Sequence, residues 1–230
     1  MKKITFILLV SLLLLPLSAK ANQRLAVVEL FTSQGCSSCP PADAFLGELS
    51  MRNDVLALAF HVDYWDYIGW KDIHASPEYT QRQRNYASAF NLRYVYTPQM
   101  VVAGDYETSG NSRRNVVRAI EKELSKASDL DIRAADGVIA VSGPAQNQNI
   151  HVYRVSFIKE EKTKVRRGEN RGKTLTDYNI VSDLVHVGNW RGGDQTFTYD
   201  VADLDPNHGH AIFLQRANDL KILTAIRLTN

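Results

Sequence analysis

The chain has two cysteines, and only two serines separate them, in Cys36-Ser37-Ser38-Cys39. An apolar run, 25–31, precedes this motif, and a helical pattern, 41–49, follows it. A cysteine at a helix start meets free N–H groups and the positive end of the helix dipole, which favour a thiolate over a thiol. Because a thiolate attacks disulfides and a second thiol can then release the product, the motif predicts thiol–disulfide exchange. Cys36 is the predicted exposed nucleophile, and Cys39 is the buried resolving thiol.

Two other interpretations of the cysteine pair stay open. Secreted proteins often hold two cysteines in a structural disulfide, although a bridge that closes so short a loop constrains the unfolded chain little. The two thiols with His61 are also the beginning of a metal site, which would need three or four converging ligands. The alternatives to an oxidoreductase are therefore a metal-handling protein and a binding module with an inert bridge. The oxidoreductase interpretation requires no cofactor.

The first 21 residues have the features of a cleavable signal peptide. Lys2 and Lys3 precede an apolar run, 4–15, and Ala19-Lys20-Ala21 fits a small-x-small cleavage site. The apolar run is too short to span a membrane. We therefore expect a periplasmic or secreted protein without a stable membrane anchor, whose mature chain begins near Asn22.

Removal of this segment changes the charge of the chain. Lys2, Lys3 and Lys20 leave with it, so that 24 basic residues face 25 acidic ones and the net charge becomes −1. A nearly neutral chain does not point to binding of nucleic acid or of a membrane surface. The expected partner is a protein or small molecule that carries a thiol or a disulfide. The sequence leaves the oligomeric state open.

Strand and helix patterns alternate in the first half of the mature chain. Apolar runs predict strands at 25–32 and 54–63, and two short strands are predicted at 99–103 and 106–108. Helices are predicted at 41–49, after the cap Ser76-Pro77, and after Asn111-Ser112. The resulting order is βαβαββα, which places the cysteines between the first strand and the first helix.

From about Asp129 the pattern becomes that of an all-β segment. Strand candidates lie at 137–142, 149–158, 177–187, 195–201, 211–215 and 222–228. Several short strands with this spacing predict a small sandwich, and the basic segment 159–173 is predicted to be a solvated hairpin tip. The predicted division is a signal peptide, 1–21, a first domain, 22–128, and a β-sandwich-like domain, 129–230.

Four segments resemble a family of secreted, thioredoxin-like proteins of unassigned function. They are Val28–Asp43 around the cysteines, His61–Asp66, Tyr96–Gln99 and Arg167–Asn170. The resemblance covers essentially the whole mature chain. It implies an α/β thioredoxin-like N-terminal domain followed by an all-β, sandwich-like C-terminal domain, and it names no substrate.

The resemblance adds Pro98, Thr97 and Glu29 to the candidate site residues. Pro98 takes the place of a proline that faces the cysteines in such proteins and is usually cis, and the backbone at Thr97 would pair with an extended substrate. Glu29 is a charge inside an apolar strand, which is costly unless it is paired or protonated. It resembles the buried acid that accepts the proton of the resolving cysteine, although it lies one residue further from Cys36 than expected. The alternative is a carboxylate at the sheet edge.

Overall fold

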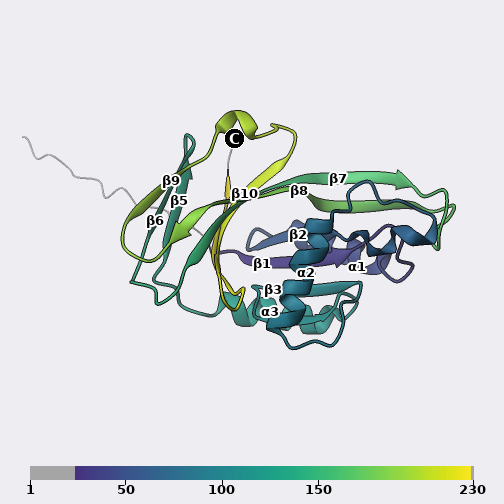
Figure 1. Ribbon diagram of the computed structural model, residues 1–230, viewed down its shortest axis with the longest axis horizontal. Helices are drawn as coiled ribbons and strands as arrows, with labels where there is room; N and C mark the ends of the chain where they lie inside the picture. Colours follow the sequence, from purple (N-terminus) through teal and green to yellow (C-terminus); the bar gives the residue numbers. More distant parts are fainter. Residues whose placement is uncertain (1–23, 229–230) are drawn as a thin grey trace, which may run out of the picture.

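The computed structural model describes residues 24–228, so that the predicted signal peptide lies outside the described residues. Eight strands form one mixed sheet in the order β11-β10-β7-β8-β2-β1-β3-β4, and three more form a small sheet in the order β5-β6-β9 (Figure 1). Within these residues no helix has the length and apolar character that a bilayer crossing requires.

The predicted element order βαβαββα of the first half is confirmed, with one additional 3-10 helix. The elements are β1 (Ala26–Thr32), α1 (Pro40–Ser50), β2 (Val55–His61), η1 (Asp63–Ile68), α2 (Pro77–Ala89), β3 (Gln99–Val102), β4 (Tyr106–Ser109) and α3 (Arg113–Leu124). Capping agrees with the sequence at α2, where the Ser76 hydroxyl accepts a hydrogen bond from the Glu78 N–H at 3.1 Å.

The second half consists almost entirely of strands. They are β5 (Asp131–Ala135), β6 (Val138–Ser142), β7 (Ile150–Lys164), β8 (Thr174–Trp190), β9 (Gln195–Thr198), β10 (Gly209–Arg216) and β11 (Ile222–Leu228), with a short 3-10 helix, η2 (Val201–Asp203), before β10. β7 and β8 are 15 and 17 residues long and form a hairpin that runs alongside β2 (Figure 1). β7 extends into the basic segment 159–173 that was predicted to be a solvated tip, as far as Lys164, and β8 begins directly after that segment at Thr174.

The predicted fold class, an α/β thioredoxin-like domain followed by a separate β sandwich, is wrong. The protein is mostly β, and strands from both halves form the same sheet, because β8 pairs with β2 at Ile180 and Ala59. The Asn179 side chain also donates a hydrogen bond to the Ala57 carbonyl at 2.8 Å. The Tyr178 ring covers Gly47 of α1 so closely that a Cβ there would lie 2.6 Å from it.

The hydrophobic core is shared in the same way. On one face of β1 and β2, Val28 and Leu30 pack with Phe45 of α1 and Ile120 of α3. On the other face, apolar residues of the first half join residues of the second half: Phe31, Phe60, Tyr86, Val155 and Phe213. Because the cluster on this second face contains residues of both halves, the two halves form one folded unit. A third cluster joins the small sheet to the large one.

Candidate functional site

Cys36 and Cys39 lie between β1 and α1, and they form a disulfide bond. Cys39 is the N-cap of α1, and two prolines occupy the first helical positions, where a missing N–H removes no helical hydrogen bond. The expectation that Cys36 is exposed is wrong for this oxidised state, because both cysteines are fully buried. Only Ser37 and Ser38 between them are exposed. Other parts of the molecule therefore cover the disulfide.

The side chain of Trp65 lies between the segment Thr97–Pro98 and the cysteine turn. The peptide bond between Thr97 and Pro98 is cis, which confirms that prediction. The indole N–H of Trp65, in η1, donates a hydrogen bond to Thr97 Oγ1 at 2.7 Å. A Cβ placed on Gly35 would lie 3.1 Å from the Cβ of the same tryptophan. Trp65 thus connects the segment before β3 to the residue that precedes Cys36.

Glu29 lies on the opposite face of the sheet from α1. Its neighbours in β1, Val28 and Leu30, pack against α1 and α3, and successive strand residues point to opposite faces. The fully buried Glu29 carboxylate accepts a hydrogen bond from Arg82 Nε at 2.7 Å and another from the Tyr86 hydroxyl. Its charge is therefore paired within the core rather than turned toward the cysteines.

Asp43 is a buried acid in the first turn of α1, close in sequence to Cys39. It follows Cys39 by four residues, so the two side chains lie on one face of the helix, and its N–H donates to the Cys39 carbonyl at 3.1 Å. Burial, together with the nearby Asp177 carboxylate, raises the pKa of Asp43 to about 8. Thr32 Oγ1 donates to the carboxyl group at 2.7 Å. With this pKa, the Asp43 carboxyl is largely protonated at neutral pH. Asp43 rather than Glu29 is therefore the candidate for the buried acid that exchanges a proton with the resolving cysteine.

A buried histidine–aspartate pair lies at the end of β2 beside Asp43. His61 Nδ1 lies 2.7 Å from Asp72 Oδ2, and both residues are 1 % exposed. Although burial by itself lowers the pKa of His61, the charge and hydrogen bond of Asp72 raise it to about 9. Within the described residues, His61 Nε2 is buried and has no hydrogen-bond partner. The imidazolium thus compensates part of the negative charge of the neighbouring acids.

Gln34 ties this pair to the cysteine turn and to β8. Its N–H donates to Asp72 at 2.8 Å, and its side-chain NH₂ donates to Asp177 of β8 at 3.0 Å. Its side-chain oxygen accepts a hydrogen bond from Trp70 Nε1 at 3.1 Å. Gln34 is 1 % exposed, two residues before Cys36. The cluster of Asp43, His61, Asp72 and Asp177, called here the acid–histidine cluster, is thus held on the cysteine loop.

The turn Arg167–Asn170, between β7 and β8, covers the cysteines from the second half of the chain. The side-chain NH₂ of the fully buried Asn170 donates to the carbonyls of Gln34 and Cys36, both at 2.9 Å. The exposed Glu169 carboxylate accepts a hydrogen bond from the Ser37 N–H at 3.1 Å, which lowers its pKa. This segment is therefore not a freely solvated tip, because it binds the cysteine loop directly.

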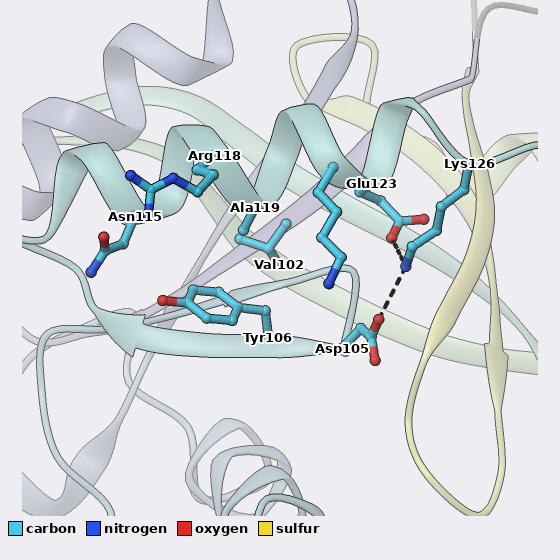
Figure 2. A pocket seen from close by; sticks show the side chains of 9 residues that line it. Val102, Asp105, Tyr106, Asn115, Arg118, Ala119, Glu123 and Lys126 are labelled. Atoms are coloured by element: carbon cyan, nitrogen blue, oxygen red, sulfur yellow. Dashed lines mark hydrogen bonds and ion pairs between the residues drawn. The ribbon is translucent and has the colours of Figure 1, made fainter.

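Two further features of the structure concern possible ligand sites: the arrangement of potential metal ligands, and a pocket away from the cysteine turn. In residues 24–228, no group of three or more His, Cys, Asp and Glu side chains is arranged to hold a metal ion. A pocket of about 250 Å³ lies between α3 and the β3–β4 hairpin, where Figure 2 shows Tyr106 and Arg118 at one end and Lys126 bound to Glu123 and Asp105 at the other. Neither the cysteine turn nor any predicted site residue lines it.

Comparisons with known proteins give a family and two structural neighbours. The model of a family described as "Protein of unknown function (DUF1223)" matches residues 27–215. No curated protein matches the chain. A crystal structure of a structural-genomics target from Agrobacterium tumefaciens is similar, with 32% identity and a TM-score of 0.76, over 90% of this chain and 96% of that one. HBP35 of Porphyromonas gingivalis, at 11% identity and a TM-score of 0.60 over 90% and 75% of the two chains, shares the fold alone.

Proposed function

The chain belongs to this DUF1223 family of unknown function, so its activity has to be inferred from its site, and we propose that it is a thiol–disulfide oxidoreductase of the periplasm or extracellular space. The observation that carries the proposal is the buried carboxyl of Asp43, one helical turn after Cys39, whose burial raises its pKa. A disulfide that only staples a loop gains nothing from a costly buried acid. A disulfide that opens and closes needs a group that exchanges a proton with the buried thiol.

The exchange follows from the positions of these groups. A substrate thiolate attacks Cys36 Sγ, the Cys36–Cys39 bond breaks, and Cys39 leaves as a thiolate that takes the proton of Asp43. A second substrate thiolate then attacks the substrate sulfur of the mixed disulfide and releases Cys36 as a thiolate. Two electrons have passed from the substrate dithiol to the protein, and the substrate holds a new disulfide. In the reverse direction the protein reduces a substrate disulfide, and the Asp43 carboxylate recovers the proton.

Access to Cys36 requires its cover to move. Asn170 is fully buried, whereas the hydrogen bond between Glu169 and Ser37 lies at the surface, where a charged contact is worth little. The contact between Glu169 and Ser37 is therefore the part of the cover that opens at least cost. Thr97 and Pro98, which Trp65 fixes beside the loop, would then pair with the backbone of the entering substrate.

The test is the chemistry of the cysteines in the reduced protein. Cys36 is expected to react with iodoacetamide with a pKa below the ordinary thiol value of about 8.5, and Cys39→Ser is expected to retain a substrate as a mixed disulfide. Cys36→Ser is the matched control, because it keeps one thiol but loses the nucleophile. An ordinary pKa for Cys36 and no mixed disulfide would contradict the proposal. Stoichiometric Zn²⁺ binding by the reduced protein would favour the metal-handling alternative, which uses the cysteines with His61.

A further inference from the structure

Three arginines surround the turn that covers the disulfide. Arg166, Arg167 and Arg171 are all exposed, and in the part of the chain that the structure describes none of them forms an ion pair. The carboxylate within the same turn, Glu169, is engaged by the Ser37 N–H. The turn thus presents more positive than negative charge to the solvent.

The position of these charges is fixed relative to the cysteines. Asn170, between Arg167 and Arg171 in the sequence, binds the Cys36 carbonyl at 2.9 Å. The Lys173 ammonium donates to the Asn170 side-chain oxygen at 2.9 Å and so adds a further positive charge. A negatively charged group that approached Cys36 from this side would meet several cations at once, and the low local screening within a few ångströms favours that encounter.

A segment next to both the cysteine loop and this turn carries exposed apolar side chains. Tyr67 is 82% exposed and Ile73 is 68% exposed, although both side chains are large and apolar. Ile68 of the same segment lies against both the loop and the turn, because its Cδ1 would lie 3.4 Å from a Cβ on Gly35 and 3.5 Å from a Cβ on Gly168. The exposed apolar residues of the 67–73 segment and the arginine turn therefore flank one loop, that of the disulfide.

We propose that this surface docks an extended, acidic polypeptide segment whose cysteines exchange with Cys36. The inference rests on the proposed function and names its substrate class. The unpaired arginines select carboxylates on one side of the substrate cysteine, and Tyr67 and Ile73 receive apolar side chains on the other. Because the two features lie on different elements next to the loop, a chain segment reaches both and a small thiol reaches one.

The experiment uses the mature protein, reduced beforehand so that Cys36 is a free thiol, and synthetic nonapeptides with one intramolecular disulfide, flanked on one side by Glu, Gln or Lys. The Glu peptide is expected to exchange about fivefold faster in kcat/KM than the Gln peptide at low salt, and the Lys peptide to exchange more slowly. In the triple variant R166Q/R167Q/R171Q, the three peptides are expected to exchange with similar kcat/KM values. Arg133→Gln is the matched control, since Arg133 is an exposed arginine of β5 in the small sheet, and it is expected to keep the order of the wild type.

A second arm separates this inference from the proposed function. The same peptides with Ser in place of Cys are titrated into the oxidised protein, so that binding is measured without exchange. Preferential binding of the Glu peptide, lost in the triple variant, would support the docking surface even if no peptide exchanged thiols. Equal affinity and equal kcat/KM for the Glu and Gln peptides, or a preference that the triple variant retains, would overturn it. An exchange rate with glutathione disulfide that matches the Glu peptide would overturn the choice of a polypeptide.

Discussion

Two clusters of buried charge lie on opposite faces of β1 and β2, and they are built differently. The first joins Glu29 to Arg82 on the α2 side of the sheet. The second is the acid–histidine cluster on the α1 side, beside the disulfide. Both are buried within the core and both draw on residues of the second half of the chain. Their difference lies in how completely each charge is satisfied.

The Glu29–Arg82 cluster is closed. Each Glu29 oxygen accepts one hydrogen bond, from Arg82 or from Tyr86, and a second guanidinium N–H of Arg82 donates to Gln215 at 3.1 Å. Gln215 in turn donates to the Tyr86 hydroxyl at 2.8 Å. The guanidinium also lies 5.3 Å from the centroids of the Phe60 and Tyr86 rings. Such a network stabilises the fold and leaves no group free for chemistry.

The acid–histidine cluster is open. It places three carboxyl groups around one imidazole, and His61 Nε2 has no hydrogen-bond partner within the described residues. The acids cannot all ionise at low cost, which is why the pKa of Asp43 rises to about 8 while that of Asp72 falls. Burial alone therefore does not distinguish a structural charge from a reactive one. The distinguishing feature is a buried charge that its neighbours compensate only in part and that lies close to a bond that can break, here the Cys36–Cys39 disulfide.

The largest expected effect on stability follows from removing the second half of the chain, which contributes residues to both clusters. A fragment of residues 22–127 lacks Asp177 and Gln215, along with the strand that pairs with β2 and the apolar residues that cover Phe31 and Phe60. We expect it to show no cooperative unfolding transition in urea, whereas the mature chain does. Sharp, well-dispersed amide resonances for the fragment would show that the first half folds alone and that the shared sheet is dispensable.

Opening the closed cluster is expected to have the next largest effect. Arg82→Met leaves the Glu29 carboxylate buried without its partner, which costs about 3–5 kcal/mol of unfolding free energy. The double variant E29Q/R82M removes both charges and is expected to recover part of that loss. Arg52→Met is the matched control, because the Arg52–Asp54 pair is about one-third exposed, and a loss below about 1 kcal/mol is expected. Equal losses in both arginine variants would refute the comparison.

Local patterns in the sequence predict the elements well where one segment contains the whole signal. The apolar run, the two prolines and the helical period place β1 and α1 within one or two residues, and Thr97-Pro98 is visible as a dipeptide before a strand. Glu29 also stands out, because a charge within an apolar strand is visible locally. These features depend on neighbours in the chain and not on the arrangement of strands.

The pairing of β8 with β2 and the role of Asp43 depend on distant residues and could not be predicted in this way. The strand Val55–His61, which is apolar up to Phe60, has the same sequence pattern whether its edge is paired with another strand or covered by a loop. An aspartate in the first turn of a helix is ordinarily a favourable partner of the helix dipole. Asp43 becomes a perturbed acid because the fold buries its carboxyl group and because β8 brings Asp177 next to it.

A smaller loss of stability is expected when the hydrogen bonds between Asn170, in the second half of the chain, and the cysteine loop are removed. Asn170→Ala removes two buried hydrogen bonds to the carbonyls of Gln34 and Cys36, and we expect a loss of about 1–3 kcal/mol in the unfolding free energy of the oxidised protein. The reduced variant should also show a Cys36 alkylation rate different from that of the wild type. Asn189→Ala is the control, since Asn189 is an exposed residue of β8 whose side chain contacts His186 and not the cysteine loop. Unchanged stability and alkylation in the Asn170 variant would mean that the turn does not position the loop.

The most specific test of the open cluster is the pH dependence of the stability of the Asp43→Asn variant. The pKa of Asp43 rises from an ordinary 3.8 to about 8 on folding, so the folded state binds this proton more tightly than the unfolded state. Stability from this group is fully present below about pH 4 and is lost as the pH rises toward 8. The amide that replaces the carboxyl does not titrate, so the variant is expected to gain on the order of 1–3 kcal/mol relative to the wild type between pH 5 and pH 8.

Urea unfolding of the oxidised proteins at these two pH values measures this difference. Glu48→Gln on the exposed side of α1 is the control, because its carboxylate is half exposed and pairs with Arg113 at the surface, away from the acid–histidine cluster. The relative stability of that variant should be nearly independent of pH. If Asp43→Asn behaves in the same way, the Asp43 carboxyl is ionised in the folded protein at pH 7. Cys39 would then have no proton donor within its own helix, and the acid–histidine cluster would be a second structural network rather than part of the exchange reaction.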